Sequence, residues 1–218
     1  QNPHPPMWLA GMQPETYRIA ADKGLGVLSL STGAPAEMAP YIKEYKENIK
    51  KANPVGDMVN DQWAHLAVSH CGEDDRLAKD TAVTALKSFF GPDRPYTKGE
   101  GDVYKQLIKA WGGVPDHLKN QFSWVLKEDE DSVPESREAR ETSVNVSGIE
   151  GFDSDTLSDR GVIIAGDPES CKEGVRIHQE AGEDQVLLLM QLDTIPHEEV
   201  IKSIKLFGTE VMPEFKSD

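Results

Sequence analysis

The chain has 218 residues, which is enough for one domain with a single hydrophobic core and an irregular insertion. Its 38 Asp and Glu residues outnumber 23 Lys and Arg, and the net charge of -15 argues against nucleic acid or an anionic membrane as partner, because both attract basic surfaces. No apolar run approaches the roughly 20 residues that span a bilayer. The two cysteines lack metal-ligand spacing, which fits free thiols and a cytoplasmic location, although a disulfide between them stays open.

The first ninety residues alternate short apolar runs, which predict strands, with segments of helical periodicity. Predicted strands cover residues 7–10, 25–30 and 62–70. Predicted helices cover residues 14–23, 35–51 and 73–90. Pro14 at the start of the first helix and Gly24 directly after it are typical helix boundaries.

Residues 91–161 differ from this pattern, with many Pro and Gly residues and the acidic run KEDEDSVPESREARE, and they predict an insertion. Short helices are predicted within it at 102–111 and 115–125. Regular periodicity then returns. It predicts strands at 162–166 and 185–191 and helices at 168–181 and 196–213.

Strands that are apolar throughout and alternate with helices are typical of a parallel sheet covered by helices. We count four principal βα units, half of an α/β fold of the (β/α)8 TIM-barrel type, in a single domain over residues 1–218 with the insertion at 91–161. Four units alone leave two open sheet edges. Because the sequence also starts without Met, we expect a homo-oligomer, edges covered by the insertion, or a missing N-terminal half.

Three segments resemble, in the same order, the bacterial-luciferase-like family of flavin-dependent monooxygenases. They are PHPPMWLAGMQPETYRIAADKGLGVLSLS, VIIAGDPESCKEGVRIHQEAGEDQVLLLMQL and IPHEEVIKSIKLFGTEVMPEF. The shared pattern is a proline-rich lead-in, a strand, a loop ending in Pro-Glu, a helix and G-x-G-V-L-S, followed later by G-x-P-E and a final helix ending E-V-x-P. The resemblance covers residues 3–70 and 160–215 and implies the C-terminal portion of a (β/α)8 barrel.

The resemblance implies an enzyme that takes reduced FMN from a separate flavin reductase and uses dioxygen to oxygenate a small organic substrate. Some family members use a deazaflavin for hydride transfer instead. The alternative is a truncated barrel that binds flavin or another phosphorylated ligand without turnover, or an inactive fragment. Fold analogy alone does not decide between these functions.

The resemblance also implies that the loop of Gly11, Met12 and Gln13 receives the flavin phosphate. This loop joins a strand to a helix N-terminus, where backbone N–H groups and the helix dipole favour an anion. Thr16 in the first turn and Ser29 at the end of the next strand are further cofactor-binding candidates. The structural alternatives are a tight turn at Gly11 and capping or turn roles for the two hydroxyls.

His70 closes the third predicted strand, where it is a candidate catalytic acid or base. A hydrogen-bonded structural histidine is the alternative that we favour. Gln191 ends the last predicted strand and either binds substrate or bridges loops. The six histidines never fall into a metal-ligand spacing, so we expect no metal.

Overall fold

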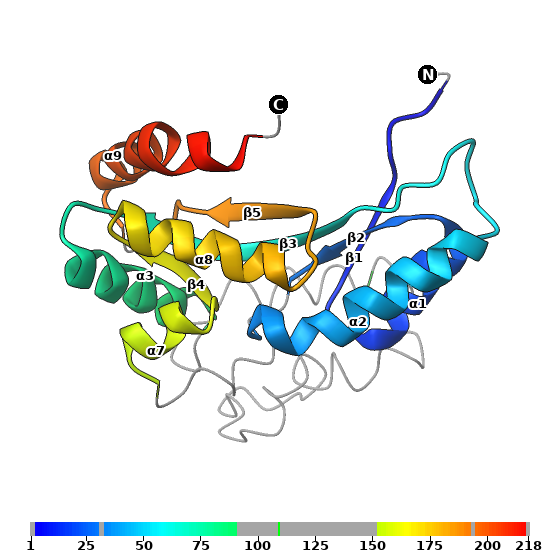
Figure 1. The fold of residues 1–218 in the computed structure, drawn as a ribbon, viewed down its shortest axis with the longest axis horizontal. Coiled ribbons are helices and arrows are strands. Elements are labelled where there is room, and N and C mark those ends of the chain that lie inside the picture. Colours follow the sequence, from blue (N-terminus) through cyan, green and yellow to red (C-terminus); the bar gives the residue numbers. More distant parts are fainter. Residues whose placement is uncertain (1–2, 31–32, 91–108, 110–151, 193–194, 217–218) are drawn as a thin grey trace.

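The computed structural model describes residues 3–30, 33–90, 109, 152–192 and 195–216. These form one parallel sheet with helices packed on it (Figure 1). The helices predicted at 102–111 and 115–125 lie almost wholly outside the described residues, and the single-domain assignment stays a prediction. Within the described residues, no helix is both long and apolar enough to cross a membrane.

Five strands make up the sheet, each followed by a helix, so the described residues hold one βα unit more than the four counted from the sequence. Each strand coincides with a predicted strand to within two residues. They are β1 (Trp8–Gly11), β2 (Gly26–Ser29), β3 (Trp63–Cys71), β4 (Ile163–Gly166) and β5 (Gln185–Leu189). The principal helices also follow the predictions. They are α1 (Pro14–Lys23), α2 (Pro35–Asn48) with the 3-10 turn η1 (Ile49–Lys51), α3 (Asp75–Phe90), α8 (Pro168–Glu180) and α9 (His197–Leu206).

Two features differ from the predicted helices. A short helix, α7 (Ser154–Asp159), lies in the predicted insertion, where Asp153 caps it by accepting a hydrogen bond from the Thr156 N–H. The last predicted helix is divided, because α9 continues as a π-helical segment, η4 (Phe207–Val211), and a 3-10 segment, η5 (Met212–Phe215). Short π and 3-10 segments commonly terminate or interrupt an α-helix.

All strand pairs are parallel, and β3 is the centre of the sheet. Ala64 and His65 pair with both β2 and β5, so those two strands lie on opposite sides of β3. Val68 pairs with both β4 and β5, so β4 follows β2 along the same side, nearer the carboxyl end. The continuous row is therefore β1-β2-β3-β5, with β4 beside the second half of β3.

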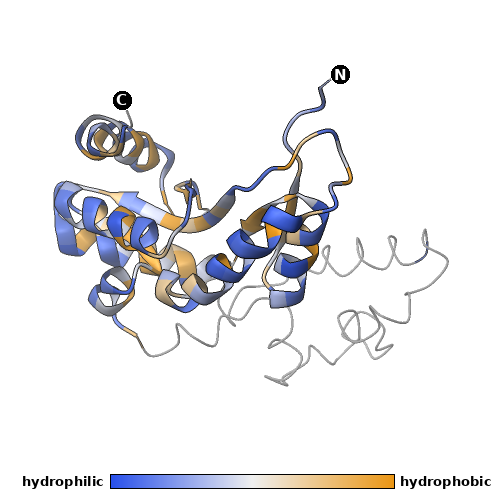
Figure 2. Cartoon of the chain, turned by 45° about the vertical axis from the view of Figure 1, so that its right-hand side comes forward, coloured by the Kyte–Doolittle hydropathy of each residue, from blue (hydrophilic) through white to orange (hydrophobic). Residues whose placement is uncertain are grey.

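Helices cover the two faces of the sheet unequally. On one face, α1 and α2 pack on β1, β2 and Trp63, while α8 and η4 pack on β3 around Ala67 and Cys71. On the other face, α3 covers only the carboxyl half of β3 and β4. There Trp8 of β1 and Leu187 of β5 are 38% and 40% exposed. Figure 2 shows apolar colouring gathered on the strands and on the helix sides facing them.

The cysteines Cys71 and Cys171 are both free and buried, as the sequence predicts for thiols. They share one core cluster between β3 and α8. Contact with the Cys171 thiol lowers the pKa of Cys71, and the same contact together with burial raises the pKa of Cys171. The pair therefore belongs to the packed core.

Candidate functional site

The N-terminus of α1 lies directly after β1, at the carboxyl end of the sheet, as predicted for a phosphate site. Gln13 is the N-cap residue and makes no side-chain capping hydrogen bond, and Pro14 occupies the first turn. The Thr16 N–H donates to the Gln13 carbonyl at 2.9 Å, which closes the first turn tightly. Pro14 has no N–H group and those of Thr16 and Tyr17 point to the Gln13 carbonyl, so the first turn presents the Glu15 N–H and the positive dipole potential to an anion.

Gly11 is fixed by its contact with Thr16. A Cβ atom at Gly11 would lie 2.5 Å from Thr16 Cγ2, so any side chain there would displace Thr16. The Gly11 carbonyl accepts a hydrogen bond from the Leu30 N–H at 3.4 Å, which links the loop to the end of β2. The structure thus requires glycine for a close approach of loop and helix, beyond the turn that sequence alone suggests.

Charged groups beside this helix N-terminus partly cancel. Glu15 in the first turn lies 3.7 Å from Arg18, whose guanidinium also donates to Glu44 of α2 at 2.9 Å. All three side chains are at least 42% exposed, so solvent weakens these pairs. Glu15 is the one feature of the loop that disfavours an anion.

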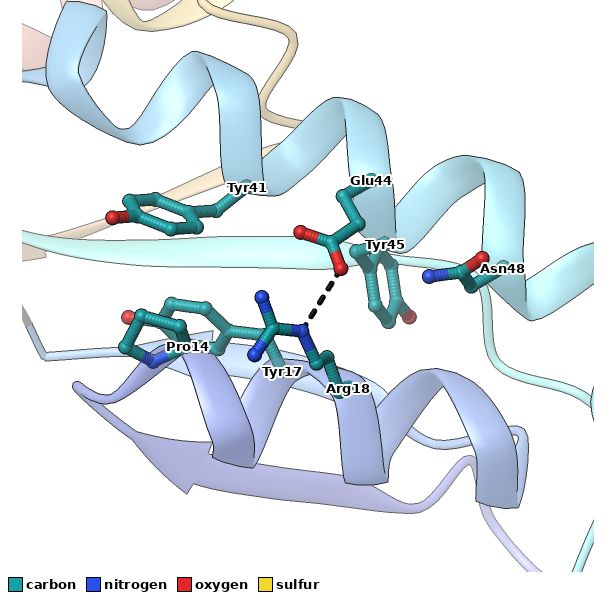
Figure 3. A pocket seen from close by; sticks show the side chains of 7 residues that line it. All are labelled: Pro14, Tyr17, Arg18, Tyr41, Glu44, Tyr45 and Asn48. Atoms are coloured by element: carbon teal, nitrogen blue, oxygen red, sulfur yellow. Dashed lines mark hydrogen bonds and ion pairs between the residues drawn. The ribbon is translucent and has the colours of Figure 1, made fainter.

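A surface pocket lies between α1 and α2, beside the phosphate-site loop (Figure 3). The ion pair of Arg18 and Glu44 crosses it, and the surrounding side chains leave no enclosed space for even a water molecule. Ligand pockets commonly measure about 300–1,000 Å³. This pocket is therefore too small for a flavin ring.

Ser29 lies on the helix-covered face of the sheet. Its side chain is fully buried, and its hydroxyl lies 3.4 Å from the Tyr17 hydroxyl of α1. Burial raises the pKa of Tyr17, opposed by this hydrogen bond. Ser29 therefore contacts the underside of α1 instead of the open end of the loop.

His70 is 7% exposed near the carboxyl end of β3, in the row that faces α3 and α9. Its Nδ1 has no hydrogen-bond partner among the described residues. Burial lowers the pKa of His70, and the charge of Glu199 in α9 opposes that shift. The described residues thus supply no partner for Nδ1, and the choice between a catalytic and a hydrogen-bonded structural histidine stays open.

The predicted site residues do not form one compact cluster. Gly11 pairs with Ser29 and Ser29 with His65, so His70 lies five residues farther along the sheet. Two strand spacings and five residue rises separate Gly11 from His70 by roughly 20 Å in a flat sheet. Gln191 is exposed just beyond β5, and Met12 is half-buried in the loop. A bound cofactor would have to be long to reach from the loop to His70.

The N-terminus of α8, which follows β4 as α1 follows β1, is already filled. Asp167 accepts from the Ser170 N–H at 2.9 Å, and Asp75 of α3 accepts from the Asp167 N–H at 3.0 Å. Burial raises the pKa of Asp75, but hydrogen bonds from Lys79, Ser170 and Asp167 outweigh it, so the pKa is lowered. The protein's own carboxylates occupy this helix end.

Sequence reasoning missed a buried cluster of His65, His178 and Glu183 beneath α8. His65 and Glu183 are 118 positions apart, and His178 and Glu183 are five apart. Neither separation matches a recognised metal-ligand motif. Only the parallel pairing of β3 with β5 brings the three side chains together.

The comparisons with known proteins agree with the predicted fold. The model of the luciferase-like monooxygenase family matches residues 1–185. The monooxygenase RslO1 from Streptomyces bottropensis is similar in structure, with TM-score 0.61, 16% identity, and coverage of 99% of this chain and 50% of that chain. So is the coenzyme F420 dependent tetrahydromethanopterin reductase from Methanopyrus kandleri, with TM-score 0.55, 21% identity, and coverage of 97% and 51%.

A third similar structure is the oxygenating constituent of 3,6-diketocamphane monooxygenase from Pseudomonas putida, in complex with FMN. It gives TM-score 0.53 and 18% identity, with 96% of this chain and 49% of that chain covered. None of the curated proteins matches. At these identities the likeness concerns the fold alone, and this chain spans about half the length of the similar structures. It is a partial barrel, and with residues 1–185 matched by the family model, the chain belongs to the luciferase-like monooxygenase family.

Proposed function

We propose that this chain is part of a flavin-dependent monooxygenase that uses reduced FMN and dioxygen to oxygenate a small organic substrate. Family membership supports a flavin enzyme, and a similar structure contains FMN. Other similar structures depend on coenzyme F420, a deazaflavin, so hydride transfer is the alternative reaction. We therefore propose FMN, and not a deazaflavin, as the cofactor. The proposal also includes a separate flavin reductase that supplies FMN in its reduced form.

The observation that carries this proposal is the open N-terminus of α1. Gly11, Met12 and Gln13 would hold the flavin phosphate through backbone N–H groups, and the Thr16 hydroxyl would add a donor from the first turn. A Cβ atom at Gly11 would collide with Thr16, so only glycine allows the loop to lie this close to the first turn of α1. The flavin, when bound, supplies the reactivity toward dioxygen.

The remaining site residues would act around that anchor. Ser29 supports α1 from beneath through Tyr17. His70 would offer a neutral imidazole as acid or base, consistent with the lowering of its pKa by burial. Gln191 is exposed beyond β5, where its amide is available to a substrate oxygen. The chain's part is to anchor the phosphate, exclude water and hold the substrate.

Titration with oxidised and reduced FMN tests the proposal, with flavin fluorescence and absorbance as readouts. Gly11→Asp should weaken binding at least tenfold, about 1.4 kcal/mol, because its carboxylate displaces Thr16 and repels the phosphate. Gly208→Asp is the matched control: it adds the same charge at a glycine of η4 whose Cβ would meet nothing within 4 Å. Equal binding by both variants would contradict the phosphate site.

A second function is supported by one observation, the coverage of only about half of each similar structure. On that basis the chain would bind flavin or another phosphorylated ligand without turnover. Incorporation of an oxygen atom from dioxygen into the substrate in the presence of reduced FMN separates the two functions, because free reduced FMN also consumes oxygen. A monooxygenase consumes oxygen and modifies its substrate, whereas a binding protein retains affinity for FMN without substrate oxygenation.

A further inference from the structure

A second cluster of chemistry-bearing side chains lies away from the proposed flavin loop, on the helix-covered face of the sheet. His65 comes from β3, His178 from α8, and Glu183 from the segment that leads into β5. The three side chains are 3%, 1% and 0% exposed. Groups this polar are rarely buried so completely unless they are paired or hold a metal ion.

The contacts within the cluster are short and directed. The two carboxylate oxygens of Glu183 lie 2.8 Å from His65 Nδ1 and 2.7 Å from His178 Nδ1. His178 Nε2 lies 3.0 Å from the Gly161 carbonyl oxygen. Burial raises the pKa of Glu183, but the contacts with both histidines outweigh it, so the pKa is lowered and the carboxylate is ionised at neutral pH.

A count of protons identifies what the cluster requires. A backbone carbonyl only accepts, so His178 Nε2 must carry a proton. A neutral imidazole would then direct the lone pair of Nδ1 at a carboxylate oxygen 2.7 Å away, which is repulsive. A proton, carried by the ring or by the carboxyl group, or a metal ion must therefore lie between His178 Nδ1 and Glu183.

We propose that His65, His178 and Glu183 bind a divalent transition-metal ion of the zinc class through the two Nδ1 atoms and one carboxylate oxygen. The three donor atoms lie within 4.8 Å of one another. Two imidazoles and a carboxylate form a zinc-type ligand set. The bond from His178 Nε2 to the Gly161 carbonyl orients the ring as supporting hydrogen bonds do for metal-binding histidines.

Entry of the ion needs only a local adjustment. Donors at about 2.1 Å from a tetrahedral ion are separated by roughly 3.4 Å. Whichever carboxylate oxygen binds the ion, its contact of 2.7 or 2.8 Å with one Nδ1 atom would thus open by about 0.6 to 0.7 Å, while the ion replaces the proton on His178 Nδ1. The ion would join β3, α8 and the start of β5. The metal proposal is independent of the flavin proposal, because none of the three metal-binding residues lies in the Gly11 loop.

Metal titration of the full chain tests the site. After dialysis against a chelator and its removal, the chain should take up one equivalent of Zn²⁺ or Co²⁺, measured by elemental analysis and by the visible absorption of Co²⁺. Binding should release about one proton per ion, because ligands must be deprotonated. Glu183→Gln should weaken affinity at least about 100-fold, since losing even a supporting contact costs 10- to 100-fold.

His197→Gln is the matched control, because it removes an exposed histidine of α9 outside the cluster. It should leave stoichiometry, spectrum and proton release unchanged. The proposal is overturned if the wild-type chain takes up no stoichiometric metal, or if Glu183→Gln, shown to be folded by circular dichroism, binds it equally well. The cation would then be a proton. Wild-type stoichiometry and proton release remain decisive even where the variant does not fold.

Discussion

Helices α1 and α8 begin alike and differ in what occupies their N-termini. Each has Pro in its first turn and follows the carboxyl end of a parallel strand, β1 or β4. At α8, Asp167 caps the helix from within and Asp75 reaches it from α3. At α1, Gln13 provides no side-chain cap. The chain supplies capping carboxylates to one helix end and none to the other.

This difference indicates which helix is available for an outside ligand. A helix N-terminus favours negative charge whether it comes from a side chain or from a phosphate. Because α8 is already satisfied, a phosphate there would have to displace two carboxylates. At α1 it would compete only with water and with the repulsion from Glu15, which Arg18 partly offsets. The following changes test this contrast between a closed and an open helix.

The largest expected effect is at the other end of α8, where Glu183 fixes the helix to β3. In metal-free buffer, Glu183→Gln should lower the free energy of unfolding by about 3 kcal/mol, because it breaks a buried charged contact. The pKa of Glu183 is lowered on folding, so its contribution is complete above its ordinary pKa of 4.5 and is lost as pH falls toward the folded-state value. Urea unfolding at several pH values measures both effects.

The matched control for that change is Glu180→Gln, which removes an exposed carboxylate in the last turn of α8. Its free energy of unfolding should stay within about 0.5 kcal/mol of wild type. As the pH falls below 6, the free energy of unfolding of Glu183→Gln should also decrease less than that of wild type. Identical acid profiles for Glu183→Gln and wild type would contradict the role of the carboxylate.

Asp75→Ala should open the closed N-terminus of α8. It removes the acceptor for the Asp167 N–H and a partner 2.8 Å from the buried Lys79 ammonium. We expect a loss of about 2 kcal/mol, below that of a fully buried pair because the Asp75 side chain is 37% exposed. Inorganic phosphate should then raise the thermal midpoint of the variant more than chloride does at equal ionic strength.

Glu73→Ala is the control for that experiment, since Glu73 is an exposed carboxylate two residues before the start of α3. Its response to phosphate should equal that of wild type. If Asp75→Ala gains nothing specific from phosphate, a helix end relieved of one of its two carboxylates, with Asp167 still in place, would be insufficient for anion binding in this fold. The argument for α1 would then be weakened as well.

Gly11→Ala tests how tightly the open loop is fitted. Its Cβ would lie 2.5 Å from Thr16 Cγ2, and relief of that overlap should cost about 1.5 kcal/mol. Thr16→Ser removes the methyl group concerned, so the double variant should recover most of the loss. Gly208→Ala, which meets nothing within 4 Å, should not be destabilised. A Gly11→Ala variant as stable as wild type would mean that the loop relaxes freely.

The positions of the helices and strands could be predicted from the sequence, but not which side chains face a packed helix and which face the open end of the sheet. Apolar runs and helix boundaries such as Pro14 and Gly24 are local, and the strands and helices appear where they indicate. Ser29 seemed able to face a ligand, yet the pairing register turns its hydroxyl toward Tyr17. The cluster around Glu183 depends on the pairing of β3 with β5, which joins residues 118 positions apart. Long-range register of this kind has no local sequence signal.

The smallest expected effects compare the two N-cap residues directly. Asp167→Ala removes a capping acceptor and should cost about 1 kcal/mol, whereas Gln13→Ala removes no capping bond and should stay within about 0.5 kcal/mol of wild type. Gln13→Asp should stabilise α1 by up to about 1 kcal/mol and weaken FMN binding in the same protein, because its carboxylate would take the place of the phosphate. Urea unfolding and FMN titration on the same samples measure the two quantities. A Gln13→Asp variant with higher stability and unchanged FMN affinity would separate the helix N-terminus from the flavin site.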